Sequence, residues 1–444
     1  MANELFLSLL TIMTKKKLLF LLSLISISFS AQIYRPIDTA DYIQRKEFIK
    51  NFSSGNEMLV RNIKSKYPGK TGSELEKIYS EFEKDFIKQV KNKDFIFASV
   101  FDSKVKSLIE RLRKNNPEIP KNLNILIAKD NTPNAYCLAD GTFVINMGLF
   151  YWLDNDDQIA SVISHELGHK MEEHSLKAFL SYINQNQKDR ITVKSLKAVK
   201  ENQKQNAFEI LKSRVYKKSI EKRNDEIQAD SLGYAVFRKS DFSKSEFVNA
   251  LKKLQQFDTI SPRQLKVETY KKYFTLPQQE FKEKWLNKED FSLYNYNHFK
   301  EKLDKDSLSS HPEVALRIEK LKTTFPELAS SSVSPEASES FKNLEKTARM
   351  ESMPNLYHSE DYGLGIYASL QSLQDGEEEI YHKMWLGKYF SKIYEARKNY
   401  NLNRYLDRVD PKNQSESYQQ FLNFMWNLSL DEIKNIADYY QKKS

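Results

Sequence analysis

The sequence is poor in cysteine and glycine. Cys137 is the one cysteine among 444 residues, so no disulfide can form within the chain, and a disulfide-stabilised scaffold is excluded. Glycine accounts for only 11 residues, whereas residues of high helix propensity such as lysine, glutamate and leucine are frequent. We therefore predict a mainly α-helical protein with a small β-sheet, an α+β fold, in which Cys137 is a small buried residue rather than a ligand.

Long hydrophobic stretches are missing after the N-terminal segment, where none reaches the roughly 18 residues of a transmembrane helix. At the N-terminus, Lys15–Lys17 precede the short apolar run Leu18–Phe29, and small residues follow it. This pattern is typical of a secretory signal peptide, here residues 1–31, with Met1 or Met13 as its start. We expect a soluble periplasmic protein with no transmembrane anchor after signal removal; a retained anchor is the alternative.

Charge of one sign is not concentrated in any part of the chain. The 69 lysines and arginines and the 60 aspartates and glutamates give a net charge of +9, but they are interspersed along helical stretches. This distribution is typical of solvated helix surfaces, and no nucleic-acid recognition motif accompanies it. Nucleic acid is therefore not an expected partner.

An H-E-x-x-H pattern lies in a predicted helix that Asn155 is placed to cap. One apolar face of this helix is formed by Ile159, Val162, Ile163, Leu167 and Met171. His165 and His169 are four residues apart, so both imidazoles leave the same side of the helix and can share a metal ion. Glu166 lies beside the first histidine, where it can take a proton from water as a general base. The alternative is an ordinary amphipathic helix with two surface histidines.

A second acidic pair supplies the third ligand that a catalytic zinc needs. Glu226 and Asp230 are also four residues apart in a predicted helix, so they share one face. Glu226 can complete the coordination shell, and Asp230 is placed to accept the free N–H of a liganding imidazole. The sequence therefore predicts one Zn²⁺ per chain, held by His165, His169 and Glu226.

The predicted elements divide the chain into five segments. These are the signal peptide 1–31, an N-terminal helical region 32–118, a zinc metallopeptidase core 119–328, a serine-rich linker 329–340 and a helical C-terminal domain 341–444. The helices expected in the N-terminal region are Thr39–Asn51, Gly72–Asn92 and Phe95–Lys114. The core should contain a strand at Asn122–Lys129 and a hairpin turning at Asp140-Gly141.

Three further segments are predicted with less sequence support. The helix of the H-E-x-x-H pattern is expected to continue to about Tyr182. Residues 184–224 contain no glycine or proline and are expected to form a surface helical insertion. Helices at 365–373 and 377–399 are candidates for a repeat-type α-hairpin, but no repeat period supports this, and a small helical domain is the alternative.

The motifs together resemble the zinc endopeptidases that include the CAAX prenyl protease, HtpX and the periplasmic protease BepA. The resemblance covers about residues 120–325, through H-E-L-G-H, His174 five residues later, E-I-Q-A-D, N-A-Y-C-L-A-D-G-T-F-V-I-N-M-G-L-F and His311-Pro312 with Arg317. Its soluble exported members are the most similar. The resemblance implies a gluzincin-type core whose edge strand binds extended substrate backbone, with Asn134 and Ala135 beside the groove.

Three residues near these motifs have open roles. Arg317 either pairs with a carboxylate near the site or stabilises the oxyanion. His311 is either a turn residue or a resting-state cap on the metal. On a continuous helix His174 points well away from His169, so we expect it to be structural.

The function predicted from these residues is an exported zinc-dependent endopeptidase of the EC 3.4.24 type. Its expected partners are protein or peptide substrates, and its expected role is protein quality control in the cell envelope. The alternative is a periplasmic chaperone or assembly factor that binds unfolded or outer-membrane proteins through its C-terminal helices, with proteolysis secondary. In that case outer-membrane assembly components would also be partners.

Overall fold

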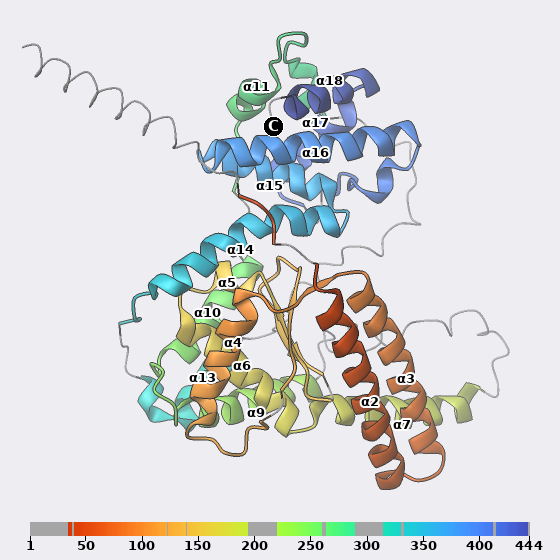
Figure 1. Cartoon of the computed structure of the whole chain (residues 1–444), viewed down its shortest axis with the longest axis vertical. Helices are drawn as coiled ribbons and strands as arrows, with labels where there is room; N and C mark the ends of the chain where they lie inside the picture. The colour runs from red at the N-terminus through yellow and green to blue at the C-terminus, as the bar shows by residue number, and fades with distance from the viewer. Residues whose placement is uncertain are drawn as a thin grey trace, which may run out of the picture.

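A computed structural model describes the chain over the greater part of its length (Figure 1). The described residues are 34–37, 40–121, 123–138, 140–193, 220–259, 263–288, 314–329, 333–411 and 414–442. The predicted signal peptide, His311 and most of the predicted 184–224 insertion lie outside them. Among the described residues, no helix combines the length and the apolar character needed to cross a membrane.

The fold is mainly helical with one four-stranded mixed sheet, as predicted. The strands are β1 (Phe95–Ile96), β2 (Ile125–Ala128), β3 (Ala135–Cys137) and β4 (Phe143–Asn146), in the order β1-β2-β4-β3. β2 and β4 are parallel, whereas the two outer pairs are antiparallel. The predicted hairpin is therefore confirmed, and β3 forms an edge of the sheet.

The predicted helix Phe95–Lys114 is wrong at its start. Phe95 and Ile96 pair with β2, and helix α4 runs from Val100 to Arg113. Ser99 and Asp102 form a capping box, which fixes the helix start. A strand of two residues is set by its partner across the sheet, so local sequence carries no signal for it.

Alternation along the strands gives the sheet two buried faces. One face, with Phe95, Leu126 and Val144, packs against α2 (Tyr42–Lys66) and α3 (Lys70–Lys91). The other face, with Ile127 and Ile145, packs in a larger cluster. The elements that contribute to this larger cluster include α4, α5 (Leu149–Trp152), α6 (Asp156–Met171), α9 (Ile220–Phe237), α10 (Glu246–Thr259), α13 (Val314–Thr324), the 3-10 helix η3 (Pro326–Ala329) and the first half of α14 (Glu339–His358). Figure 1 shows the sheet between these two layers.

Helix α6 is fixed at both ends. Asn155 caps it by accepting a hydrogen bond from Gln158 N, as predicted. The same asparagine donates to the buried carboxylate of Glu246, which ties the start of α6 to α10. At the other end, Glu173 has φ of 52°, and a new helix, α7 (His174–Val193), begins there. The predicted continuation of α6 to Tyr182 is therefore wrong.

A second hydrophobic cluster contains most of the C-terminal helices, in the upper part of Figure 1. They are α14 (Glu339–His358), α15 (Tyr362–Gln374), α16 (Glu379–Lys398), α17 (Glu416–Asn427) and α18 (Leu430–Gln441), with the 3-10 helix η4 (Leu402–Arg404). Helix α11 (Val267–Phe274) and the 3-10 helix η1 (Glu283–Leu286) pack in the same cluster. Part of the predicted segment 119–328 therefore packs with the C-terminal helices, and the predicted segment boundaries stay a prediction.

Candidate metal centre

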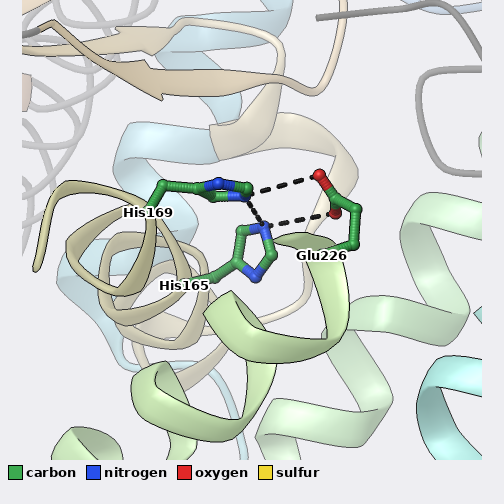
Figure 2. A group of neighbouring side chains, drawn as sticks. All are labelled: His165, His169 and Glu226. Atoms are coloured by element: carbon green, nitrogen blue, oxygen red, sulfur yellow. Dashed lines mark hydrogen bonds and ion pairs between the residues drawn. The ribbon is translucent and has the colours of Figure 1, made fainter. Parts of the chain in front are cut away.

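Helices α6 and α9 bring three potential ligand side chains together. His165 and His169 from α6 and Glu226 from α9 place one ligand atom each within 4.8 Å of one another (Figure 2). The two Nε2 atoms are 3.0 Å apart. The Glu226 carboxylate oxygens lie 3.4 Å from Nε2 of His169 and 3.5 Å from Nε2 of His165. The geometry therefore unites the three predicted ligands, although their binding of a metal stays a prediction.

Two glycines let the helices approach closely enough for this. A Cβ atom at Gly168 would lie 2.4 Å from the carbonyl oxygen of Ala229. A Cβ atom at Gly233 would lie 2.7 Å from the carbonyl oxygen of Ser164. Such contacts are too short for any side chain, so glycine at both positions sets the separation of α6 and α9.

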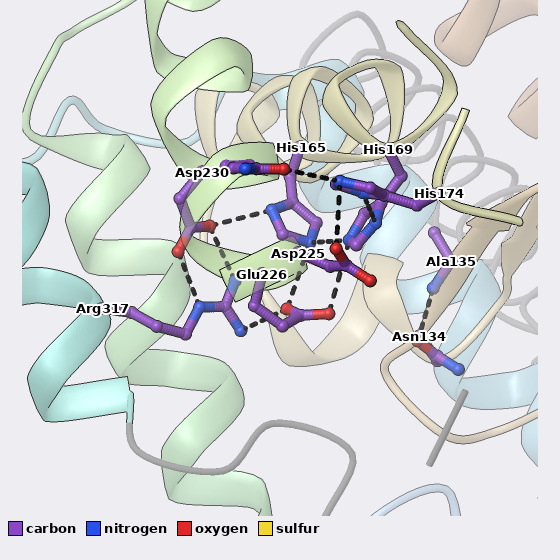
Figure 3. Close-up of polar contacts among 10 residues, drawn as sticks. Asn134, Ala135, His165, His169, His174, Asp225, Glu226, Asp230 and Arg317 are labelled. Atoms are coloured by element: carbon purple, nitrogen blue, oxygen red, sulfur yellow. Dashed lines mark hydrogen bonds and ion pairs between the residues drawn. The ribbon is translucent and has the colours of Figure 1, made fainter. Parts of the chain in front are cut away.

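Asp230 and Arg317 hold the site on the side of His165 (Figure 3). Asp230 Oδ1 is 2.8 Å from Nδ1 of His165, as predicted for an outer partner of a ligand. Arg317 donates through Nε and Nη2 to the two oxygens of Asp230, each at 2.7 Å. Its Nη1 atom is 2.9 Å from Oε2 of Glu226. Burial is the largest effect and raises the pKa of Asp230, but the charges and hydrogen bonds of Arg317 and His165 together outweigh it and lower the pKa overall.

His174 lies on the other side of the centre, against His169. The two Nδ1 atoms are 2.9 Å apart, and Nε2 of His174 is 3.2 Å from Oε1 of Gln228. The expectation that His174 points away from His169 is therefore wrong. It assumed a continuous helix, whereas the chain turns at Glu173 and returns His174 to the site.

The donor set fits a cation such as Zn²⁺. Nδ1 of each imidazole faces an outer partner, which leaves the two Nε2 lone pairs and the Glu226 carboxylate directed at one point. Acceptors that converge in this way repel one another unless a positive charge lies between them. Two imidazoles and one carboxylate are the protein ligands of a known type of catalytic zinc site.

The protonation of the two imidazoles differs without a metal. Burial lowers the pKa of His165 to about 4, against the opposing effect of Asp230. Burial also lowers the pKa of His169, but the hydrogen bond and charge of Glu226 outweigh it and raise the value to about 9. A metal ion that binds here would therefore displace a proton from His169.

Glu166 lies beside the three potential ligands without joining them. Its side chain is buried, with an exposed fraction of 9 %, and it accepts a hydrogen bond from the backbone of Cys137 in β3. Burial raises its pKa to about 7, which suits a group that takes and returns a proton near neutral pH.

A small cleft opens at Glu166 and His165. Asn134 and Ala135 line it, as expected from the resemblance, and Arg317 borders it. Its apolar wall is formed by Val162 and by the α10 residues Phe247, Ala250, Leu251 and Leu254. The arrangement places a hydrophobic recess next to the candidate base.

The backbone of β3 faces this cleft with its outer edge. Asn146 N donates to Asn134 O, and Leu138 N donates to Thr142 O. The even-numbered residues of this segment are therefore the ones that hydrogen-bond to β4. The backbone groups of Ala135 and Cys137 therefore point away from β4. Ala135 N–H is bonded to Asn134 Oδ1 and Cys137 N–H to Glu166, so an extended polypeptide can pair with this edge through the outward carbonyl oxygens.

Comparison with known families decides the class of protein. The model of peptidase family M48 matches residues 101–325, which is just over half of the chain. The chain belongs to peptidase family M48. M48 peptidases are zinc-dependent, and membership makes this chain a metallopeptidase by family. No curated protein sequence matches it. The predicted likeness to soluble exported members of the M48 family stays a prediction.

Proposed function

We propose that this M48 protein is an exported zinc-dependent endopeptidase that hydrolyses peptide bonds of protein substrates. The observation that carries the proposal is the convergence of His165, His169 and Glu226 beside a buried glutamate, in a cleft bordered by a strand edge. Export rests on the N-terminal lysine and apolar pattern. A role in envelope protein quality control rests on the resemblance to periplasmic relatives.

The chemistry divides between the metal and one side chain. Zinc, when bound by His165, His169 and Glu226, supplies Lewis acidity that activates water and polarises the scissile carbonyl. Glu166 takes the proton of the attacking water and later delivers it to the leaving amine. Its burial favours the protonated carboxyl, which helps it hold that proton between the two steps. Cys137 N–H fixes the carboxylate while the proton moves.

Substrate recognition follows from the two walls of the cleft. The outward carbonyl oxygens of Ala135 and Cys137 accept hydrogen bonds from the backbone of an extended chain without regard to its side chains. The apolar wall on α10 then accepts a large hydrophobic side chain next to the scissile bond. Extended segments with exposed apolar residues occur in unfolded proteins, which agrees with the proposed quality-control role.

The test compares the full chain with Glu166→Gln and with a control, Glu172→Gln. Glu172 lies at the end of the same helix but forms an exposed ion pair with Lys177. We expect the parent protein to hold about one zinc and to cleave an unfolded protein, with activity lost to a chelator and restored by zinc. Glu166→Gln should keep zinc but lose about 10²- to 10⁴-fold in rate. Glu172→Gln should match the parent. Full activity in Glu166→Gln would refute the proposed base.

A further inference from the structure

The two imidazoles of the centre have outer partners of different chemistry. His165 is held by the carboxylate of Asp230, itself paired with Arg317. His169 is held by a second imidazole, that of His174, at 2.9 Å between the Nδ1 atoms. His174 is buried, with an exposed fraction of 5 %. The buried ring of His174 therefore takes the place of water next to Nδ1 of His169.

The hydrogen bonds around His174 have a fixed direction. If His169 Nε2 faces a metal, its ring proton is on Nδ1 and must be donated to His174 Nδ1. His174 then carries its own proton on Nε2, which faces Gln228 Oε1 at 3.2 Å and Asp225 Oδ1 at 3.5 Å. Every bond in this chain has one donor and one acceptor. The reverse assignment would turn the lone pair of His174 Nε2 toward two acceptor oxygens.

We infer that His174 is a positioning residue, which fixes the tautomer and ring orientation of His169 so that its Nε2 lone pair faces the metal. The inference rests on the proposed zinc site. It extends that site to α7, because His174 is the first residue of that helix. Gln228 on α9 completes the chain of hydrogen bonds, and Asp225 of the same helix lies 3.5 Å from His174 Nε2, so the contacts run from α9 through α7 back to α6.

A purely structural role for His174 makes a different prediction. A buried residue at the start of α7 stabilises packing, and its loss would lower the melting temperature without changing the metal environment. A positioning role requires an acceptor at the place of His174 Nδ1. Asparagine carries its Oδ1 at a similar distance from the backbone, so His174→Asn should preserve the role, whereas His174→Leu should remove it.

The experiment measures metal binding by the full chain rather than activity alone. Zinc affinity is obtained by competition with a chromophoric chelator, and the ligand geometry from the visible absorption bands of the Co²⁺-substituted protein. We expect His174→Leu to bind zinc about 10- to 100-fold more weakly with altered Co²⁺ bands. His174→Asn should remain within a few-fold of the parent, with its spectrum. His358→Leu, which removes an imidazole from the end of α14 outside the centre, is the control and should match the parent.

Each outcome separates this inference from the proposed function. A parent protein that binds no stoichiometric zinc would refute the proposed function itself. If the parent binds zinc and His174→Leu binds it equally well with unchanged Co²⁺ bands, only the positioning role fails. If His174→Leu does not fold, His174→Phe takes its place, because its ring keeps the packing but carries no acceptor. Weaker zinc binding with altered Co²⁺ bands in this variant supports the role, and parent-like affinity and bands overturn it.

Discussion

Asp230 and Arg317, the charged pair behind the candidate metal site, each contact two neighbours. Arg317 contacts both Asp230 and Glu226, with an exposed side-chain fraction of 3 %. Removing one partner from such a buried set leaves uncompensated charge, which typically costs about 3–5 kcal/mol. Each of the three guanidinium nitrogens of Arg317 contacts a carboxylate: Nε and Nη2 contact Asp230, and Nη1 contacts Glu226. This favours the structural pairing of Arg317 over the oxyanion role. Arg317 thereby holds Glu226 toward the imidazoles.

A buried histidine far from the centre should make stability depend on pH. Burial lowers the pKa of His382 in α16 to about 4, below its value of about 6.5 in an unfolded chain. As pH falls below 6.5, the unfolded state binds this proton first, so stability falls until about pH 4. The expected loss from this group is about 3 kcal/mol.

The measurement is the free energy of unfolding in urea at pH 7 and pH 4 for the parent and for His382→Phe. Phenylalanine fills a similar space without a titrating group. The parent should lose about 3 kcal/mol more than the variant over this range. Equal losses in both proteins would show that His382 is not held neutral in the folded state.

Residue spacing predicted most of the centre, but not all of it. The i, i+4 pairs His165/His169 and Glu226/Asp230 are fixed by helix geometry, so the sequence alone placed them on common faces. His174 was missed because the break after Met171 has no glycine or proline to mark it. Glu173 adopts φ of 52° there, a conformation that sequence does not indicate for glutamate.

At the scale of elements, the packing of α6 on α9 determines whether the donors meet. Gly233→Ala places a Cβ atom 2.7 Å from Ser164 O and 2.9 Å from His165 Cα, both backbone atoms. The helices must separate, which moves Glu226 away from the imidazoles. We expect a loss of about 1–3 kcal/mol in stability and weaker zinc binding.

Gly55→Ala is the matched control, because Gly55 lies inside helix α2 with nothing within 4 Å of an added Cβ. There alanine should stabilise the helix by up to about 1 kcal/mol. Both variants are compared with the parent by thermal unfolding and zinc competition. A Gly233→Ala protein with parental stability and affinity would mean that α6 and α9 do not need this close approach.

Where the observed elements differ from the predicted ones, the cause is long-range pairing. The hairpin and the two core helices follow from local patterns, and both were predicted. Strand β1 exists through its pairing with β2, and α11 is placed by contacts with helices about a hundred residues later, such as the bond from Tyr273 Oη to Leu373 O. Local sequence contains neither signal.

For the whole molecule, the two hydrophobic clusters are joined through α14. Phe341, Leu344 and Ala348 pack in the larger cluster with α6 and α9, whereas Met350 and Met353 pack in the C-terminal cluster. Tyr34 near the N-terminus donates to Glu351 of the same helix at 2.6 Å. Removing the C-terminal helices therefore changes both clusters.

Deleting residues 341–444 should consequently yield a protein that does not fold correctly. It would expose Tyr270, Phe274 and Trp285, which are fully buried against the C-terminal helices. We expect aggregation, rapid proteolysis and loss of zinc binding, measured by size-exclusion chromatography, limited proteolysis and metal analysis. A monomeric truncated protein with parental stability would show that the metal site folds without the second cluster.

The chaperone alternative therefore needs a test in the intact chain. Glu166→Gln keeps both clusters and lacks the candidate base, so binding can be measured without cleavage. If the protein acts mainly by binding unfolded chains, Glu166→Gln should suppress the aggregation of an unfolded client. The parent protein with its zinc removed should suppress it equally well. If the protein acts mainly by cleavage, aggregation should proceed in the presence of Glu166→Gln, because its cleft binds one extended segment at a time and releases it intact.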